Sequence, residues 1–141
     1  MQKAALIVAA ALLGVAPAGA GETPSPAGAK VFFDNLKNGD TITSPVLIKF
    51  GISGMAVAPA GDQTPNSGHH HLIIDDTPIA GDALNLPIPA DEKHVHFGKA
   101  QTEATVTLTP GTHTLQLVLG DWTHIPHKPV VMSDKITITV K

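Results

Sequence analysis

The chain of 141 residues carries nine lysines and no arginine against twelve acidic residues, which gives a formal net charge of −3 at pH 7. This balance excludes a typical nucleic-acid partner, because phosphate binding depends on clustered lysine and arginine. There is no cysteine, so thiolates are excluded as metal ligands and as nucleophiles, and an exported form has no disulfide framework.

The first twenty residues have the layout of a cleavable signal peptide. Lys3 supplies a positive charge before an apolar run, and the small residues Ala18, Gly19 and Ala20 close it. The run is shorter than the roughly 20 residues that a membrane-spanning helix needs. We therefore predict a signal peptide at 1–20, a periplasmic or secreted location, and no membrane insertion of the mature chain.

The remaining residues predict one domain behind a short leader. Residues 21–29 are small and proline-rich, which is typical of a flexible leader. Residues 30–141 are too few to form two domains comfortably, so we expect a single domain around one hydrophobic core.

Apolar residues recur at every second position, which is the period of half-buried strands. These positions are Val46, Ile48, Phe50 and Ile52; Val106 and Leu108; Leu115, Leu117 and Leu119; and Ile136, Ile138 and Val140. No helical periodicity follows the signal peptide. We expect an all-β fold, namely an immunoglobulin-like antiparallel β-sandwich of about seven strands, with a small barrel as the alternative.

Three connections are long and proline-rich, at 53–68, 75–93 and 120–133. Long loops on a rigid β scaffold are common places for binding residues. The third of them contains two histidines.

Eight histidines are present, and most are clustered. Side chains alternate between the faces of a strand, so His69 and His71 should project together, as should His94 and His96. If those two strands are neighbours, four imidazoles meet on one surface. His124 and His127, in the 120–133 loop, would close such a site from above.

Imidazole nitrogen is a ligand suited to copper and zinc. We therefore predict a copper or zinc site whose ligands are His69, His71, His94, His96, His124 and His127. Acidic side chains often hold the second nitrogen of a metal-bound imidazole, and we predict this role for Glu103 and Asp121. His113 shares the parity of the apolar residues at 115–119, so we predict instead a hydrogen-bonding residue at the rim of the core.

Catalytic motifs are missing from the sequence: it contains no G-x-S-x-G elbow, H-E-x-x-H pair, P-loop or dinucleotide fingerprint.

The sequence leaves three hypotheses for the function. The first is an exported metal-binding protein, the second a metal-free module that contacts another envelope protein, and the third a mononuclear metal enzyme of unknown substrate. Whether the protein is an enzyme stays open, with the balance against it.

Four segments, GISGMAVAPAG, NSGHHHLIIDD, HVHFGKAQTE and HTLQLVLGDWTHIPHKPVVMSDKITI, resemble the family known as domain of unknown function 4399, which consists of small secreted bacterial proteins. The resemblance extends from about Val31 to Val140. It implies export and a β domain, and it supplies no activity and no catalytic residue.

Overall fold

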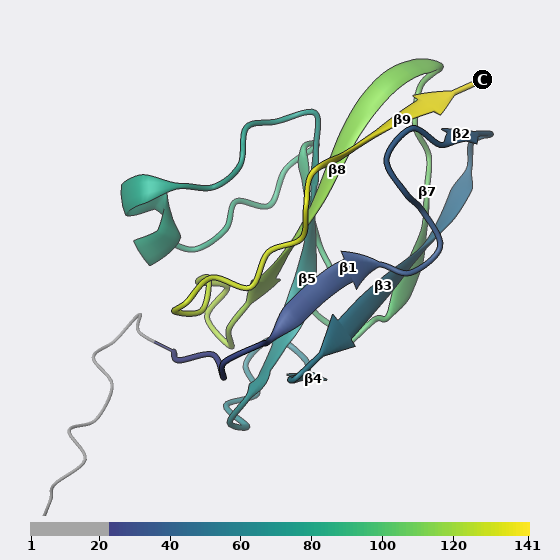
Figure 1. Cartoon of the computed structure of the whole chain (residues 1–141). Helices are drawn as coiled ribbons and strands as arrows, with labels where there is room; N and C mark the ends of the chain where they lie inside the picture. The colour runs from purple at the N-terminus through teal and green to yellow at the C-terminus, as the bar shows by residue number, and fades with distance from the viewer. Residues whose placement is uncertain (1–22) are drawn as a thin grey trace, which may run out of the picture.

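The computed structural model describes residues 23–141 (Figure 1). The predicted signal peptide and residues 21–22 lie outside the described residues. The described residues form nine strands and one short 3-10 helix: β1 (Lys30–Phe33), β2 (Thr41–Ile42), β3 (Val46–Ser53), β4 (Ala56–Val57), β5 (Ser67–Ile74), η1 (Gly81–Asn85), β6 (His94–His96), β7 (Glu103–Val106), β8 (Gly111–Gly120) and β9 (Ile136–Val140). No helix within 23–141 is long and apolar enough to cross a membrane.

The strands form two sheets, and the all-β prediction is confirmed. A three-stranded sheet has the order β1-β3-β7, and a six-stranded sheet has the order β2-β9-β8-β5-β4, with β6 also paired to β5. Pairing is antiparallel except for β2 with β9 and β4 with β5, which run parallel. The prediction of a purely antiparallel fold is therefore wrong at these two pairs. In each of them a strand of two residues pairs with a longer strand.

The main core lies between the two sheets and follows the predicted alternation. Its members include Ile48 and Phe50 from β3, Leu115 and Leu117 from β8, and Ile138 from β9. Four of these five side chains are completely buried, and Phe50 is 5 % exposed. Burial of a side chain of this kind stabilises the fold by about 1.5–3 kcal/mol, so the period-two pattern both predicts the strands and accounts for their association.

A second, smaller cluster covers the opposite face of the six-stranded sheet. Ile73 of β5 and Val118 of β8 pack there against Ile79 and Ile88 from the loop between β5 and β6. The loop thereby lies over the outer face of the sheet, and in Figure 1 the part that contains η1 extends to one side of the sheets. As a result β5 is buried on both faces along its whole length.

The described part of the predicted leader, residues 23–29, is attached to the domain. The backbone of Ser25 donates to the carbonyl of Lys128 at 3.0 Å, and the backbone of Lys128 donates to the carbonyl of Thr23 at 2.9 Å. The Thr23 hydroxyl also donates to Asp121 at 2.7 Å. Residues 23–25 therefore form a strand-like edge beside the 120–133 loop.

His113 has the structural role predicted for it. Its Nδ1 lies 2.6 Å from Asp75 Oδ2 and its Nε2 lies 2.7 Å from the carbonyl oxygen of Thr109. The hydrogen bond to Thr109 and that to Asp75 raise the pKa of His113 above its ordinary value, because both acceptors favour the doubly protonated ring.

Asp75→Asn is expected to destabilise the domain in a pH-dependent way. The pKa of His113 is higher in the folded domain than in the unfolded chain, where it is about 6.5. The interaction with Asp75 therefore contributes fully to the free energy of unfolding below about pH 6.5, and this contribution disappears as the pH rises through the pKa of the folded state. Asn suits the positive φ of 54° at this position, so the main loss is the charge. Urea unfolding should show a loss of about 1 kcal/mol at pH 5.5 and a smaller one at pH 9; equal losses would contradict this role.

Candidate metal centre

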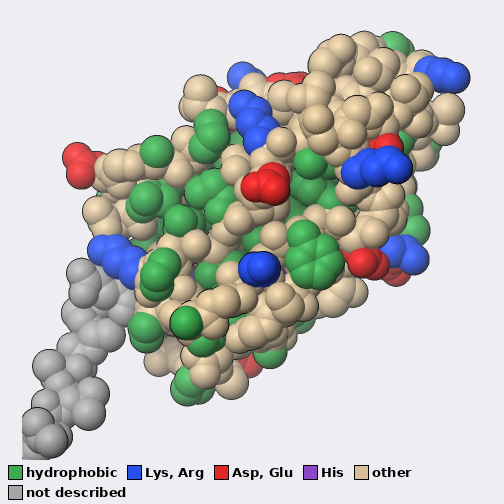
Figure 2. All heavy atoms as spheres, viewed as in Figure 1, with side chains coloured by type: hydrophobic (Ala, Val, Ile, Leu, Met, Phe, Trp, Pro, Cys, Tyr) green, Lys and Arg blue, Asp and Glu red, His purple; other side chains and the backbone are tan. Residues whose placement is uncertain are grey.

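Four histidines from three segments of the chain meet at one point. They are His69 and His71 of β5, His96 of β6, and His124 of the 120–133 loop, and one ring nitrogen of each lies within 4.8 Å of those of the other three. It is the one group of three or more histidine or acidic side chains with this spacing among residues 23–141. His69 is completely buried and His71 is 1 % exposed. The face drawn in Figure 2 shows almost no histidine surface.

The closest contacts in the group are between nitrogen atoms. His69 Nε2 lies 3.0 Å from His71 Nε2 and 3.0 Å from His124 Nδ1. The ring centroids of His96 and His124 are 4.7 Å apart, and those of His71 and His96 are 5.1 Å apart. The rings thus turn their nitrogens toward a shared centre.

Strand register places three of the four rings. β5 pairs antiparallel with β6, with His71 directly opposite His96. Side chains of directly opposed residues lie on the same face, and His69, two positions before His71, shares that face. The two histidine strands are therefore neighbours, as the predicted site requires, and their pairing brings three of the four rings together.

The fourth ring is positioned by a loop that Asp121 organises. Asp121 Oδ1 accepts hydrogen bonds from the backbone of Thr123 at 2.8 Å and of Ile125 at 3.0 Å. The backbone of His124 donates to the carbonyl of Asp121 at 2.9 Å, and His124 has a positive φ of 70°. A non-glycine residue in the left-handed region costs of the order of 1 kcal/mol or more and persists only where neighbouring contacts fix it. The hydrogen bonds of the loop therefore offset this cost and hold the ring of His124 in place.

The other long loops also reach this region. The backbone of Ile88 donates to the carbonyl of His124 at 2.8 Å, and the backbone of Gly61 donates to the carbonyl of Trp122 at 3.0 Å. The loops 53–68, 75–93 and 120–133 therefore converge beside the four histidines.

Two glycines leave space over the ligand atoms. A Cβ added at Gly120 would lie 2.7 Å from His71 Nε2, and one added at Gly98 would lie 2.7 Å from His96 Nε2. These distances are shorter than real carbon contacts allow, so any side chain at either position would displace a ring.

Burial controls the charge of the group. Desolvation, followed by repulsion from His96 and His124, lowers the pKa of His69 to about 4. Desolvation, with repulsion from His69, lowers that of His71 to about 2. Burial and His124 also lower the pKa of His96. These imidazoles are therefore neutral at pH 7 and present lone pairs to a cation.

The group leaves two of its buried nitrogens without protein support. Nδ1 of His69 and of His71 has no hydrogen-bond partner among the described residues. Asp121, predicted to support an imidazole, accepts its hydrogen bonds from Thr23, Thr123 and Ile125, and none of them comes from a histidine of the group. Burial acts to raise the pKa of Asp121, but these hydrogen bonds outweigh it and lower the pKa, so Asp121 contributes a nearby negative charge and a rigid loop.

Three other predicted site residues lie elsewhere. His94 shares the face of His96, as its parity predicts, but stands opposite Ile73 and contacts Asp91 at 2.7 Å. His127 is buried with its Nε2 3.0 Å from the carbonyl oxygen of Ser67. Glu103 is exposed on β7, in the other sheet, opposite Lys49. The structure thus brings together four of the six predicted ligands, and Glu103 is not behind any of them.

Sequence reasoning missed the roles of Gly98 and Gly120. Each lies within four residues of a predicted ligand, and this closeness was the only indication in the sequence that it belongs to the site. Glycine near a turn is common in β proteins, so the closeness did not identify its role. Their function depends on non-local contacts, and these appear only in the folded chain.

The comparisons with known proteins agree with the family suggested by the sequence. The model of the family described as "Domain of unknown function (DUF4399)" matches residues 48–141, a range that contains all four histidines of the group. No curated protein and no solved structure matches the chain. The chain therefore belongs to the DUF4399 family.

Proposed function

We propose that the protein binds one divalent metal ion, copper(II) or zinc, through His69, His71, His96 and His124. The observation that carries the proposal is the convergence of four ring nitrogens within 4.8 Å. Neutral imidazole is a good ligand for both metals, and copper(II) binds more tightly than zinc at a given nitrogen site.

The distances suit a metal without large rearrangement. Two nitrogens 3.0 Å apart, each about 2.05 Å from an ion, subtend roughly 95° at that ion, close to the right angle of tetragonal copper(II). Nitrogens bound to one ion lie at most about 4.1 Å apart at this bond length. If the widest pair, within 4.8 Å, lies on opposite sides of a tetragonal copper(II) ion, it closes by less than 1 Å, and tetrahedral zinc requires a larger closure of about 1.5 Å.

We further propose that the protein works as an exported, periplasmic or secreted metal-binding protein, for buffering, delivery or sensing. The signal-peptide pattern of residues 1–20 supports this location. The sheets that enclose one core support our interpretation of the fold as an immunoglobulin-like sandwich, with parallel additions at β2 and β4.

Titration of chelator-treated mature protein with copper(II) and with zinc tests the metal proposal. Trp122 is the single tryptophan of the chain, is 42 % exposed and lies two residues before His124, so its fluorescence should be quenched when copper(II) binds. Calorimetry should give a tight site of one ion per chain with a dissociation constant below about 1 μM, equivalent to at least about 8 kcal/mol. Failure to bind either metal at pH 7 would refute the proposal.

Gly120→Ala is expected to weaken this tight site at least about tenfold, because the new methyl group lies 2.7 Å from His71 Nε2 and the ring must turn away from the ion. Gly98→Ala should have the same effect through His96. Thr112→Ala, an exposed change in the same strand as Gly120, is the control and should leave the affinity unchanged. Calorimetry with copper(II) measures all three, and wild-type affinity in both glycine variants would show that the ion binds elsewhere.

A further inference from the structure

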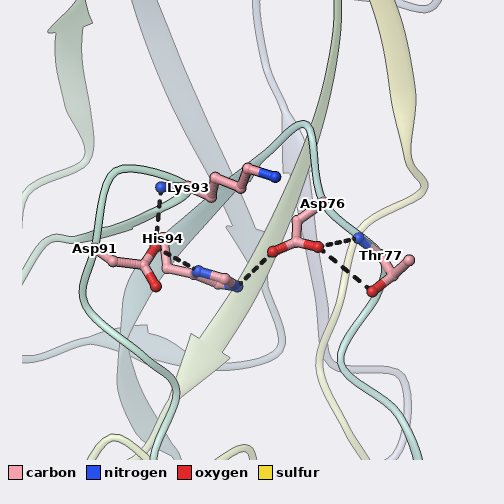
Figure 3. A network of polar contacts seen from close by, with 5 residues as sticks. All are labelled: Asp76, Thr77, Asp91, Lys93 and His94. Carbon is pink, nitrogen blue, oxygen red and sulfur yellow. Dashed lines mark hydrogen bonds and ion pairs between the residues drawn. The ribbon is translucent and has the colours of Figure 1, made fainter.

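His94 belongs to a separate arrangement, in which two carboxylates flank one imidazole (Figure 3). Asp91 Oδ1 lies 2.7 Å from His94 Nδ1, and Asp76 Oδ2 lies 3.7 Å from His94 Nε2. Neither carboxylate belongs to the four-histidine group. The arrangement therefore stands apart from the centre described above.

Asp91 fixes the orientation of the ring. Its Oδ1 also accepts the backbone N–H of Lys93 at 2.9 Å, and its backbone exchanges hydrogen bonds with that of His94 at 3.1 and 3.2 Å. A carboxylate that accepts the Nδ1 proton leaves the Nε2 lone pair free to bind a metal, and a carboxylate is one of the common partners of the second nitrogen in metal-bound histidines. The four-histidine group lacks such a pairing, whereas His94 has it.

His94 and Asp76 both line a cavity. The His94 side chain is 10 % exposed, and its Nε2 has no hydrogen-bond partner within 23–141, since Asp76 at 3.7 Å is too distant for a hydrogen bond. A cavity of about 410 Å³ adjoins it, lined by Asp76, His94 and apolar side chains that include Pro78, Ile79 and Leu86. A ring nitrogen of a largely buried histidine and a carboxylate thus lie together beside a cavity with room for additional ligands.

We propose that His94 Nε2 and Asp76 Oδ2 form a second site for a divalent first-row metal ion, with Asp91 as a positioning residue. Bonds of about 2.05 Å to both atoms across 3.7 Å subtend roughly 130° at the ion, and approach by a few tenths of an ångström gives the tetrahedral angle. Water from the cavity completes the coordination. With two protein ligands this site is weaker than the four-histidine centre and does not depend on it.

Zinc titration of the mature chain by calorimetry tests this second site. The wild type should bind two zinc ions, one tightly and one at least about tenfold more weakly. His94→Gln and Asp76→Asn should each remove the weaker event alone, whereas His71→Ala should remove the tighter event alone. Asp91→Asn should weaken the weaker event about 10- to 100-fold, as expected for loss of an outer carboxylate.

Glu92→Gln is the matched control, because it removes an acid from the same exposed turn outside the His94 arrangement, and it should leave both events unchanged. Zinc at the weaker site should also shift the imidazole NMR signals of His94 and leave those of His70 in place. A single zinc event in the wild type, or a second event that survives both His94→Gln and Asp76→Asn, would overturn the proposal. Asp76 is 34 % exposed, so its variant carries the test if His94→Gln does not fold.

Discussion

Replacing His71 by alanine is expected to lower the copper(II) affinity of the tight site by at least about 100-fold. The substitution removes a completely enclosed ligand whose Nε2 lies 3.0 Å from that of His69, and no other described histidine is near enough to take its place. The loss should exceed the 10- to 100-fold effect of a missing outer partner. Quenching of Trp122 fluorescence and calorimetry both measure it.

Two other histidine substitutions serve as controls for His71→Ala. His70→Leu changes the neighbouring residue, whose ring lies 5.1 Å from that of Phe50 on the core face. His127→Gln removes a buried ring whose Nε2 contacts the carbonyl of Ser67. Both variants should retain wild-type copper(II) affinity. If all three variants bind equally well, the four-histidine centre is not the site of binding.

His70→Leu is expected to stabilise the metal-free protein by about 1–3 kcal/mol. His70 is completely buried, and neither of its ring nitrogens has a hydrogen-bond partner in the described part of the chain. An unsatisfied buried polar group costs about 1–3 kcal/mol, and leucine fills a similar volume without that cost. The gain should raise Tm by several degrees, at about 4 °C per kcal/mol for a domain of this size.

The gain from His70→Leu should increase in acid. Burial lowers the pKa of His70 to about 4, whereas the unfolded chain has the ordinary value of about 6.5. Between these values the unfolded chain binds a proton that the folded domain does not, so the wild type loses stability as pH falls, by up to about 1.4 kcal/mol per pH unit from this residue. Urea unfolding at pH 7 and pH 5 measures the difference. A variant less stable than the wild type at both values would show that His70 has a partner.

Alternation along the strands was sufficient to predict much of the fold and part of the centre. It identified the buried residues of β3, β8 and β9, and it placed His69 with His71 and His94 with His96. Parity assigns a residue to a face and leaves the register along the neighbouring strand open. In the observed register, His96 lies opposite His71 and His94 lies opposite Ile73. Of His94 and His96, only His96 therefore reaches the centre.

The remaining features depend on contacts between distant segments. His124 joins His69 across 55 positions of the chain, and its left-handed backbone conformation depends on a loop that the local sequence does not specify. Asp121 and Glu103 were predicted from their charge and position in the sequence to support metal-bound imidazoles. Asp121 instead accepts hydrogen bonds from other donors, and Glu103 lies in the other sheet. The carboxylate that does support a histidine, Asp91, reaches His94 across a turn of three residues.

The contact between Thr23 and Asp121 joins residues separated by 98 positions, and Ser25 reaches Pro129 across 104. A precursor threaded through a membrane from its amino end releases Thr23 early and the loop with His124 among its last segments. That loop acquires these two contacts only when nearly the whole polypeptide has crossed. Export as an unfolded chain would therefore place the acquisition of the ion in the compartment of destination.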